Sequence, residues 1–164
     1  MKKGVNYKMA IEFVRIDDRL IHGQVATTWV KKYDIEQIII VNDKVAGDKI
    51  QQSVLKMSAP PELKVAIFGV DKFTEVYNSN PIKRRTMLIY TNPEDVYKNV
   101  KGGLKFPYLN VGGMKMVEGK KKISKAVSVD ERDIGFFTKL LDEEIKIEVQ
   151  MVPNDKEVQL REII

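Results

Sequence analysis

The segment at residues 15–25, with the sequence RIDDRLIHGQV, holds most of the residues in this chain that could do chemistry. It contains the only histidine, His22, together with two arginines and two aspartates. A neutral imidazole can attack phosphorus directly and form a covalent phosphohistidine. An arginine offers a planar, permanently charged fork that matches phosphate oxygens, so Arg15 or Arg19 could hold a phosphoryl group. The segment therefore indicates an anion site that contains a nucleophile.

The two aspartates need a separate explanation, because a carboxylate that faces a phosphoryl group would repel it. We expect either Asp17 or Asp18 to orient His22 or an arginine, and the other to form a turn or cap a helix. A carboxylate bonded to His22 would favour the imidazolium, whereas a nearby helix N-terminus would disfavour it. The sequence leaves the balance of these two effects open.

Composition excludes several other kinds of chemistry. The chain has 164 residues, enough for one domain with a sizeable core. It has no cysteine, which excludes disulfides, thiolate metal sites and cysteine nucleophiles. A single histidine and carboxylates without EF-hand spacing predict no metal and no cofactor. Neither a Walker A motif nor a GxGxxG dinucleotide fingerprint occurs, so a conventional nucleotide site is not expected.

Charge and hydropathy describe a basic protein without a membrane span. Lysine and arginine number 28 against 23 acidic residues, which favours an acidic partner, a phosphorylated substrate or nucleic acid. The apolar runs are far shorter than the roughly 20 residues of a membrane span, and the N-terminus lacks a signal-peptide core. We therefore expect a cytoplasmic protein. The lysines at 120–122 and Lys125 have no interleaved aromatic residues and are interpreted as a solvated loop.

Strand and helix signals alternate along most of the chain. Apolar runs rich in β-branched residues predict strands at 11–16, 37–42, 63–68, 86–90, 108–111, 123–129 and 145–152. Helical spacing of apolar residues appears at 25–33, 50–57, 70–77, 96–100 and 134–141. This alternation predicts a single α/β domain with a mainly parallel sheet of about seven strands and helices on both faces.

Signals for helix ends agree with this pattern, since Pro93 and Asp130 stand at expected starts. The pairs at 60–61 (Pro-Pro) and 102–103 (Gly-Gly) stand at expected ends. In open α/β sheets, ligands bind outside the carboxyl ends of the strands, and the loop after the first strand is a favoured place. His22 is predicted to end this loop, close to a helix N-terminus whose free N–H groups and dipole favour an anion.

Five motifs resemble, in the same order, those of the IIB subunits of the mannose/fructose/sorbose class of bacterial sugar phosphotransferase systems. They are RIDDRLIHGQV at 15–25, LKMSAPP at 55–61, NVGGM at 110–114, AVSVDERDI at 126–134 and VQMVPND at 149–155. The resemblance covers about residues 9–164, which would form one IIB phosphocarrier domain after a polar N-terminal extension at 1–8. Met9 is an alternative start.

The resemblance implies a protein-N(π)-phosphohistidine–sugar phosphotransferase. His22 would take a phosphoryl group on Nδ1 from the phosphohistidine of a IIA domain. It would pass the group to a sugar that enters through the membrane subunits IIC and IID, beside which the protein would work in the cytoplasm. The resemblance also implies supporting or phosphate-binding roles for the neighbours Arg19, Arg15, Asp17, Gly23 and Gln24, and for Phe68 and Gly69 after the third strand.

Two departures from the family pattern are visible: the N-terminal extension, and Glu143-Glu144-Ile145, where relatives often have a glycine. The sugar cannot be predicted, because its selection is expected in IIC and IID. A homodimer is a possibility. The alternative function is a non-enzymatic basic α/β module that binds nucleic acid or a phosphorylated ligand. A third possibility is a regulatory relative that has lost transfer activity, but the intact His22 loop argues against it.

Overall fold

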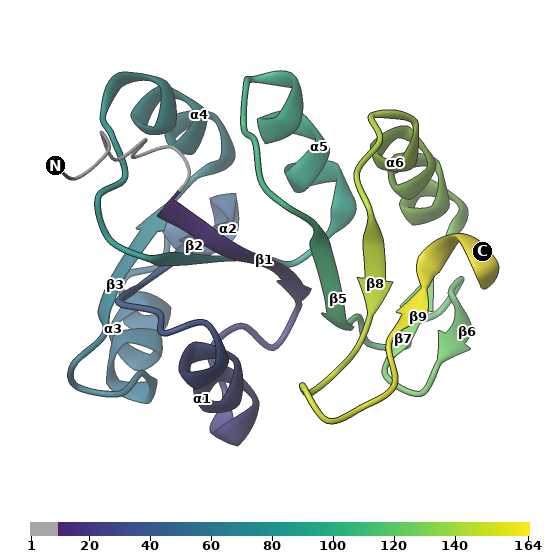
Figure 1. Cartoon of the computed structure of the whole chain (residues 1–164), viewed down its shortest axis with the longest axis horizontal. Coiled ribbons are helices and arrows are strands. Elements are labelled where there is room, and N and C mark those ends of the chain that lie inside the picture. The colour runs from purple at the N-terminus through teal and green to yellow at the C-terminus, as the bar shows by residue number, and fades with distance from the viewer. Residues whose placement is uncertain (1–9) are drawn as a thin grey trace, which may run out of the picture.

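A computed structural model describes residues 10–164, and its main feature is a seven-stranded sheet (Figure 1). In spatial order the strands are β3 (Lys64–Phe68), β2 (Gln37–Val41), β4 (Thr86–Tyr90), β1 (Ile11–Asp17), β5 (Leu109–Gly113), β8 (Ile147–Val149) and β9 (Val158–Gln159). All neighbours are parallel except β8 and β9, which are antiparallel. The predicted α/β class and mainly parallel seven-stranded sheet are confirmed.

Helices cover both faces of this sheet, as predicted. The helices α4 (Val70–Ser79), α5 (Pro93–Lys101) and α6 (Glu131–Asp142) lie above it in Figure 1, and α1 (Gly23–Lys32) and α3 (Lys49–Ser58) lie below. Two separate apolar clusters result. Phe73, Val96 and Phe137 belong to the first, and Trp29 and Leu55 to the second, together with the short helix α2 (Asp43–Ala46). Because both faces are covered, the central strands β1 and β4 are buried along almost their whole length.

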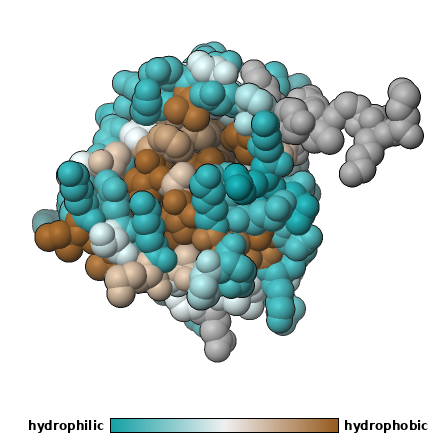
Figure 2. Space-filling model, turned by 90° about the vertical axis from the view of Figure 1, so that its left-hand side faces the viewer, coloured by the Kyte–Doolittle hydropathy of each residue, from teal (hydrophilic) through white to brown (hydrophobic). Residues whose placement is uncertain are grey.

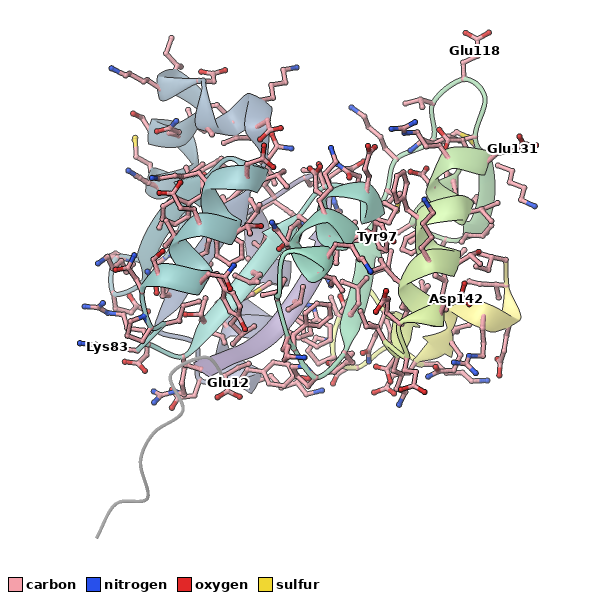
Figure 3. The ribbon with its side chains drawn as sticks, turned by 90° about the horizontal axis from the view of Figure 1, so that it is seen from above. Glu12, Lys83, Tyr97, Glu118, Glu131 and Asp142 are labelled. Atoms are coloured by element: carbon pink, nitrogen blue, oxygen red, sulfur yellow. The ribbon has the colours of Figure 1, made fainter. Side chains whose placement is uncertain are left out.

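The expected helix ends are confirmed. Asn92 caps α5 by accepting a hydrogen bond from the Asp95 N–H, with Pro93 as the first helical residue. Asp130 forms a capping box with Asp133 at the start of α6. The helices α5 and α6 then run side by side, with the rings of Tyr97 and Phe136 at 5.8 Å (Figure 3).

The predicted strand at 123–129 is wrong as a single strand. The chain instead forms a small antiparallel hairpin of β6 (Lys121–Ser124) and β7 (Val127–Val129) outside the main sheet. Lys125 and Ala126 make its turn, which an apolar count does not register. The seventh strand of the sheet is β9, which was not expected. The loop from β5 to the hairpin carries Glu118 at its projecting tip (Figure 3).

The helix predicted at 50–57 is present as α3, but the spacing did not predict which face is buried. Ile50, Val54 and Met57 are 81%, 56% and 84% exposed, while Leu55 on the opposite face packs into the core. Figure 2 views the side of the molecule that carries β3 and α3, where apolar and hydrophilic atoms are mixed. Within residues 10–164 no helix is both long and apolar enough to cross a membrane.

Candidate functional site

His22 lies at the carboxyl edge of the sheet, by which we mean the edge where the parallel strands end. The strand β1 ends at Asp17, and His22 is the N-cap of α1 with extended backbone angles (φ −150°, ψ 139°). The connecting loop is held by Leu20, whose φ of 62° lies in the left-handed region and whose side chain is buried. Such a conformation is costly for a leucine, so burial of its side chain must fix the loop.

Asp17 is the carboxylate that orients His22. Its Oδ2 lies 3.1 Å from Nε2 of the imidazole, and the Asp17 side chain is buried whereas that of His22 is 25% exposed. A carboxylate acceptor favours the tautomer with the proton on Nε2. The lone pair is then on Nδ1, the ring nitrogen that Asp17 does not engage, so the geometry prepares Nδ1 as a nucleophile.

The same carboxylate also accepts hydrogen bonds from two arginines. Nη2 of Arg15 donates to Oδ2 at 2.9 Å, and Nε of Arg19 donates to Oδ1 at 3.1 Å. Burial alone would raise the pKa of Asp17, but the charge of Arg15 and the hydrogen bonds from Arg19 and His22 outweigh it and hold the pKa below its ordinary value. Asp17 is therefore an anion that these three side chains compensate.

The two arginines differ in what they can reach. The Arg19 side chain is 45% exposed, whereas that of Arg15 is 2% exposed. Burial lowers the pKa of Arg15, and the contact with Asp17 opposes this effect. Of the two arginines proposed to hold an anion, Arg19 alone is open to one, and Arg15 lies behind Asp17.

Asp18 has the other role that the sequence left open for an aspartate. Its Oδ2 accepts a hydrogen bond from the Lys115 N–H at 2.8 Å, and its own N–H donates to the Gly113 carbonyl at 3.1 Å. Asp18 therefore joins the His22 loop to the loop that follows β5. A Cβ at Gly113 would lie 3.0 Å from Oδ1 of Asp17, so a larger residue here would press on the carboxylate that orients His22.

Other residues of the site were not predicted, although they lie in motifs that the sequence made visible. Asn110 and Gly112 belong to the NVGGM segment of β5, and Gln150 belongs to VQMVPND. The Asn110 side chain and the Gln150 carbonyl both accept from Arg15. The order of the motifs along the chain gave no sign of this contact, which depends on β1 lying beside β5.

Some predicted site residues lie apart from this cluster or outside the described residues. Phe68 and Gly69 stand at the same edge of the sheet, but β2 and β4 separate their strand from β1. That distance is about 14 Å at the usual strand spacing. Gly23 begins α1 with a φ of 43° and is exposed. Gln24 follows in the first turn, and its side chain lies outside what the structure describes. The predicted N-terminal extension at 1–8 and the alternative start Met9 also lie outside the described residues.

The basic run at 120–122 and Lys125 is only partly the solvated loop that was expected. Lys121 and Lys122 are exposed but lie on β6, Lys125 is exposed in the turn of the hairpin, and Lys120 is partly buried and pairs with Asp133 at 3.2 Å.

Comparisons with known proteins agree on one family. The family model "PTS system sorbose subfamily IIB component" matches residues 11–164. The mannose-specific EIIAB component of Escherichia coli K12 is 45% identical over 163 residues, which cover 98% of this chain. The matched residues make up 50% of that relative, so the chain spans about half of its length. The sorbose-specific EIIB component of Lacticaseibacillus casei is 43% identical over 90% of both chains.

Solved structures give the same result. The IIBSor domain of the Klebsiella pneumoniae sorbose permease has a TM-score of 0.89 and 40% identity, with 94% of this chain and 95% of that chain covered. The N-acetylgalactosamine-specific IIB component 1 of Escherichia coli has a TM-score of 0.86 and 34% identity, with 91% and 98% covered.

Proposed function

Because the chain belongs to the sorbose-subfamily IIB components of the phosphotransferase system, we propose that it carries a phosphoryl group on His22 during sugar uptake. The observation that supports this most directly is the pair of Asp17 and His22, which engages Nε2 of a partly exposed imidazole and leaves Nδ1 as the nucleophile, in the same loop as an exposed Arg19. The proposed donor is a IIA domain that carries a phosphohistidine. The proposed acceptor is a sugar hydroxyl presented by the membrane subunits IIC and IID.

The first proposed transfer forms one bond and breaks another. Nδ1 of His22 attacks the donor's phosphorus, and the N–P bond of the donor breaks with its electron pair remaining on the donor imidazole. Asp17 keeps the Nε2 proton of His22 in place throughout. Arg19 and the N-terminal N–H groups of α1 are proposed to neutralise the charge on the phosphoryl oxygens. In this chemistry, positioning and charge stabilisation supply nearly all of the catalysis.

The second proposed transfer releases the group to the sugar. A hydroxyl oxygen attacks the phosphorus and loses its proton to water, and the N–P bond to His22 breaks with its electrons returning to Nδ1. Such in-line transfers need donor and acceptor to approach closely, which suits a histidine at an exposed edge of the sheet. Residues 9–164 are proposed as one IIB domain that works in the cytoplasm, where it meets the membrane subunits.

The remaining supporting residues are proposed to act at two levels. Arg19 contacts the transferring group, and Gly23 and Gln24 lie at the helix end that faces it. Arg15 and Asp17 orient His22 from inside the protein. Phe68 and Gly69 are proposed to line the outer part of the same edge, where a partner protein would rest.

The test is to incubate the protein with phosphoenolpyruvate, the general phosphotransferase proteins and a cognate IIA domain, and then to map phosphate by mass spectrometry. We expect a single site, His22, that is labile in acid and stable in base, as a phosphoramidate should be. The variant His22→Gln should fold, as judged by circular dichroism, and remain unlabelled. Undiminished labelling of this variant, or phosphate mapped to a serine, would contradict the proposal.

A further inference from the structure

Arg15 carries a charge inside the protein and therefore needs acceptors there. Nη2 donates to Oδ2 of Asp17 at 2.9 Å, and Nη1 donates to Oδ1 of Asn110 at 2.6 Å and to the Gln150 carbonyl at 3.2 Å. The guanidinium also lies over the ring of Trp29, 5.6 Å from its centroid. Asn110 is the acceptor at the shortest distance, and it stands on the opposite side of the guanidinium's fork from Asp17.

Asn110 is itself fixed in one orientation. It is fully buried on β5, and its Cα is the register partner of Arg15 on β1. Its Nδ2 donates to the Gln150 carbonyl at 3.1 Å, which directs Oδ1 toward Arg15. Both ends of the amide are therefore engaged, so the side chain cannot flip without losing a hydrogen bond.

The same strand leaves room for the guanidinium. Gly112 follows Asn110 by two residues, so both project on one face of β5. A Cβ at Gly112 would overlap the guanidinium of Arg15. One face of β5 therefore supplies an acceptor at position 110 and empty space at position 112, and both suit the observed place of Arg15.

We propose that Asn110 is a positioning residue for phosphoryl transfer, which holds Arg15 against Asp17 and thereby limits how strongly Asp17 pairs with His22. This inference rests on the proposed function of His22. Asn110 does not contact the imidazole, so it acts through Arg15 and Asp17.

The coupling follows from one shared atom. Oδ2 of Asp17 accepts from Nη2 of Arg15 and lies 3.1 Å from Nε2 of His22. Arg15 and His22 thus compete for a single oxygen, and Arg19 holds mainly the other oxygen. When Arg15 is released from Asn110, its hold on Oδ2 weakens, and the carboxylate then favours the imidazolium of His22 more strongly. In a protein changed in this way, fewer His22 rings would be neutral and nucleophilic at pH 7.

The experiment uses Asn110→Leu, which removes both hydrogen bonds but keeps the number and branching of the side chain's heavy atoms. The chain has only one histidine, so a single ring Cε1–H resonance reports its protonation by NMR. We expect the titration midpoint of this resonance to move upward by about half a pH unit or more relative to the wild type. The transfer rate at saturating donor should fall roughly threefold to tenfold with little change in KM, because the donor-binding surface is untouched.

The matched control is Asn99→Leu. Asn99 is also buried and also bonds at both ends, to Tyr90 and to the Val70 carbonyl and Thr74, but it lies on α5 and its hydrogen bonds do not involve Arg15, Asp17 or His22. We expect a comparable loss of stability with no change in the histidine titration. If Asn110→Leu is too unstable to study, Asn110→Ser gives the same measurement, because the shorter hydroxyl does not reach Arg15.

The outcomes separate the two proposals. A histidine titration that is unchanged in folded Asn110 variants, or moved equally by Asn99→Leu, overturns the role of Asn110. Wild-type protein that accepts no phosphate on His22 overturns the proposed function instead, and the titration then still decides whether Asn110 and His22 are coupled.

Discussion

At the scale of single residues, the site depends on one carboxylate. The sequence predicted that Asp17 or Asp18 would orient His22, and the end of β1 decides between them. Asp17 is the last strand residue and is buried, whereas Asp18 is in the loop and bonds to Lys115. His22, Arg19 and Asp17 could be predicted because they are neighbours along the chain. Asn110 could not, because its contact depends on strand order.

Arg19→Lys tests whether the guanidinium stabilises the transferring group. Lysine keeps the charge but loses the planar fork, so we expect normal folding and a transfer rate lower by about 10²-fold. Rapid-quench measurement of phosphoryl transfer from the IIA domain gives the rate. The matched control is Arg85→Lys, since Arg85 is 44% exposed and pairs with Asp34 and Glu36 far from His22. A wild-type rate in Arg19→Lys would remove Arg19 from the site.

Asp17→Asn tests the charge of the carboxylate through the pH dependence of stability. The pKa of Asp17 is lowered in the folded protein, so its contribution is complete above the unfolded value of about 3.9 and is lost as pH falls through the folded value. Removing the charge leaves Arg15 buried without its anion, at a cost of about 3 kcal/mol at pH 7. Urea unfolding should show this difference at pH 7 and a smaller one at pH 3. An equal difference at both pH values would disagree with an ionised Asp17.

At the scale of elements, long periodic segments were predictable and short ones were not. The helices α4, α5 and α6 each have a regular apolar stripe and a capped start or end. The strand β9 has two residues, and α2 has four, so neither contains enough residues to show a period. In α3 the period was correct, but periodicity does not indicate which of two opposite faces is buried, and Leu55 and Ile50 turned out to be on different sides.

The turn after α6 carries strain that a substitution should relieve. Glu144 has a φ of 63°, in the left-handed region where glycine is favoured. We expect Glu144→Gly to raise the free energy of unfolding by about 0.5–1 kcal/mol. The control Glu143→Gly should lower it instead, because Glu143 has an ordinary φ of −81° and pairs with Lys101. Thermal unfolding of both variants shows whether each substitution raises or lowers the melting temperature. A Glu144→Gly variant with a lower melting temperature than the wild type would contradict the strain at Glu144.

At the scale of the whole molecule, the sheet brings the reactive loop and the loop after β5 to one edge. The loops that follow parallel strands begin at that edge, so Asp18 in the His22 loop meets Lys115 although they are 97 positions apart in the sequence. The chain has a net charge of +5, and the basic side chains Arg19 and Lys115 are exposed at this edge. An acidic partner surface would therefore be attracted to the edge that holds the nucleophile.

This attraction predicts how the association rate with the IIA donor depends on salt. Complementary charge mainly raises the association rate, and the Debye length falls from about 10 Å at 0.1 M salt to about 3 Å at 1 M, so stopped-flow association should slow over that range. Lys115→Gln should slow association at low salt, whereas Lys64→Gln should not, because Lys64 begins β3 at the opposite edge of the sheet. An association rate that stays constant with salt would mean that the partners meet through apolar contacts and that the basic excess is ordinary solvated surface. Equal slowing in both variants would mean that the overall charge, and not the carboxyl edge, attracts the donor.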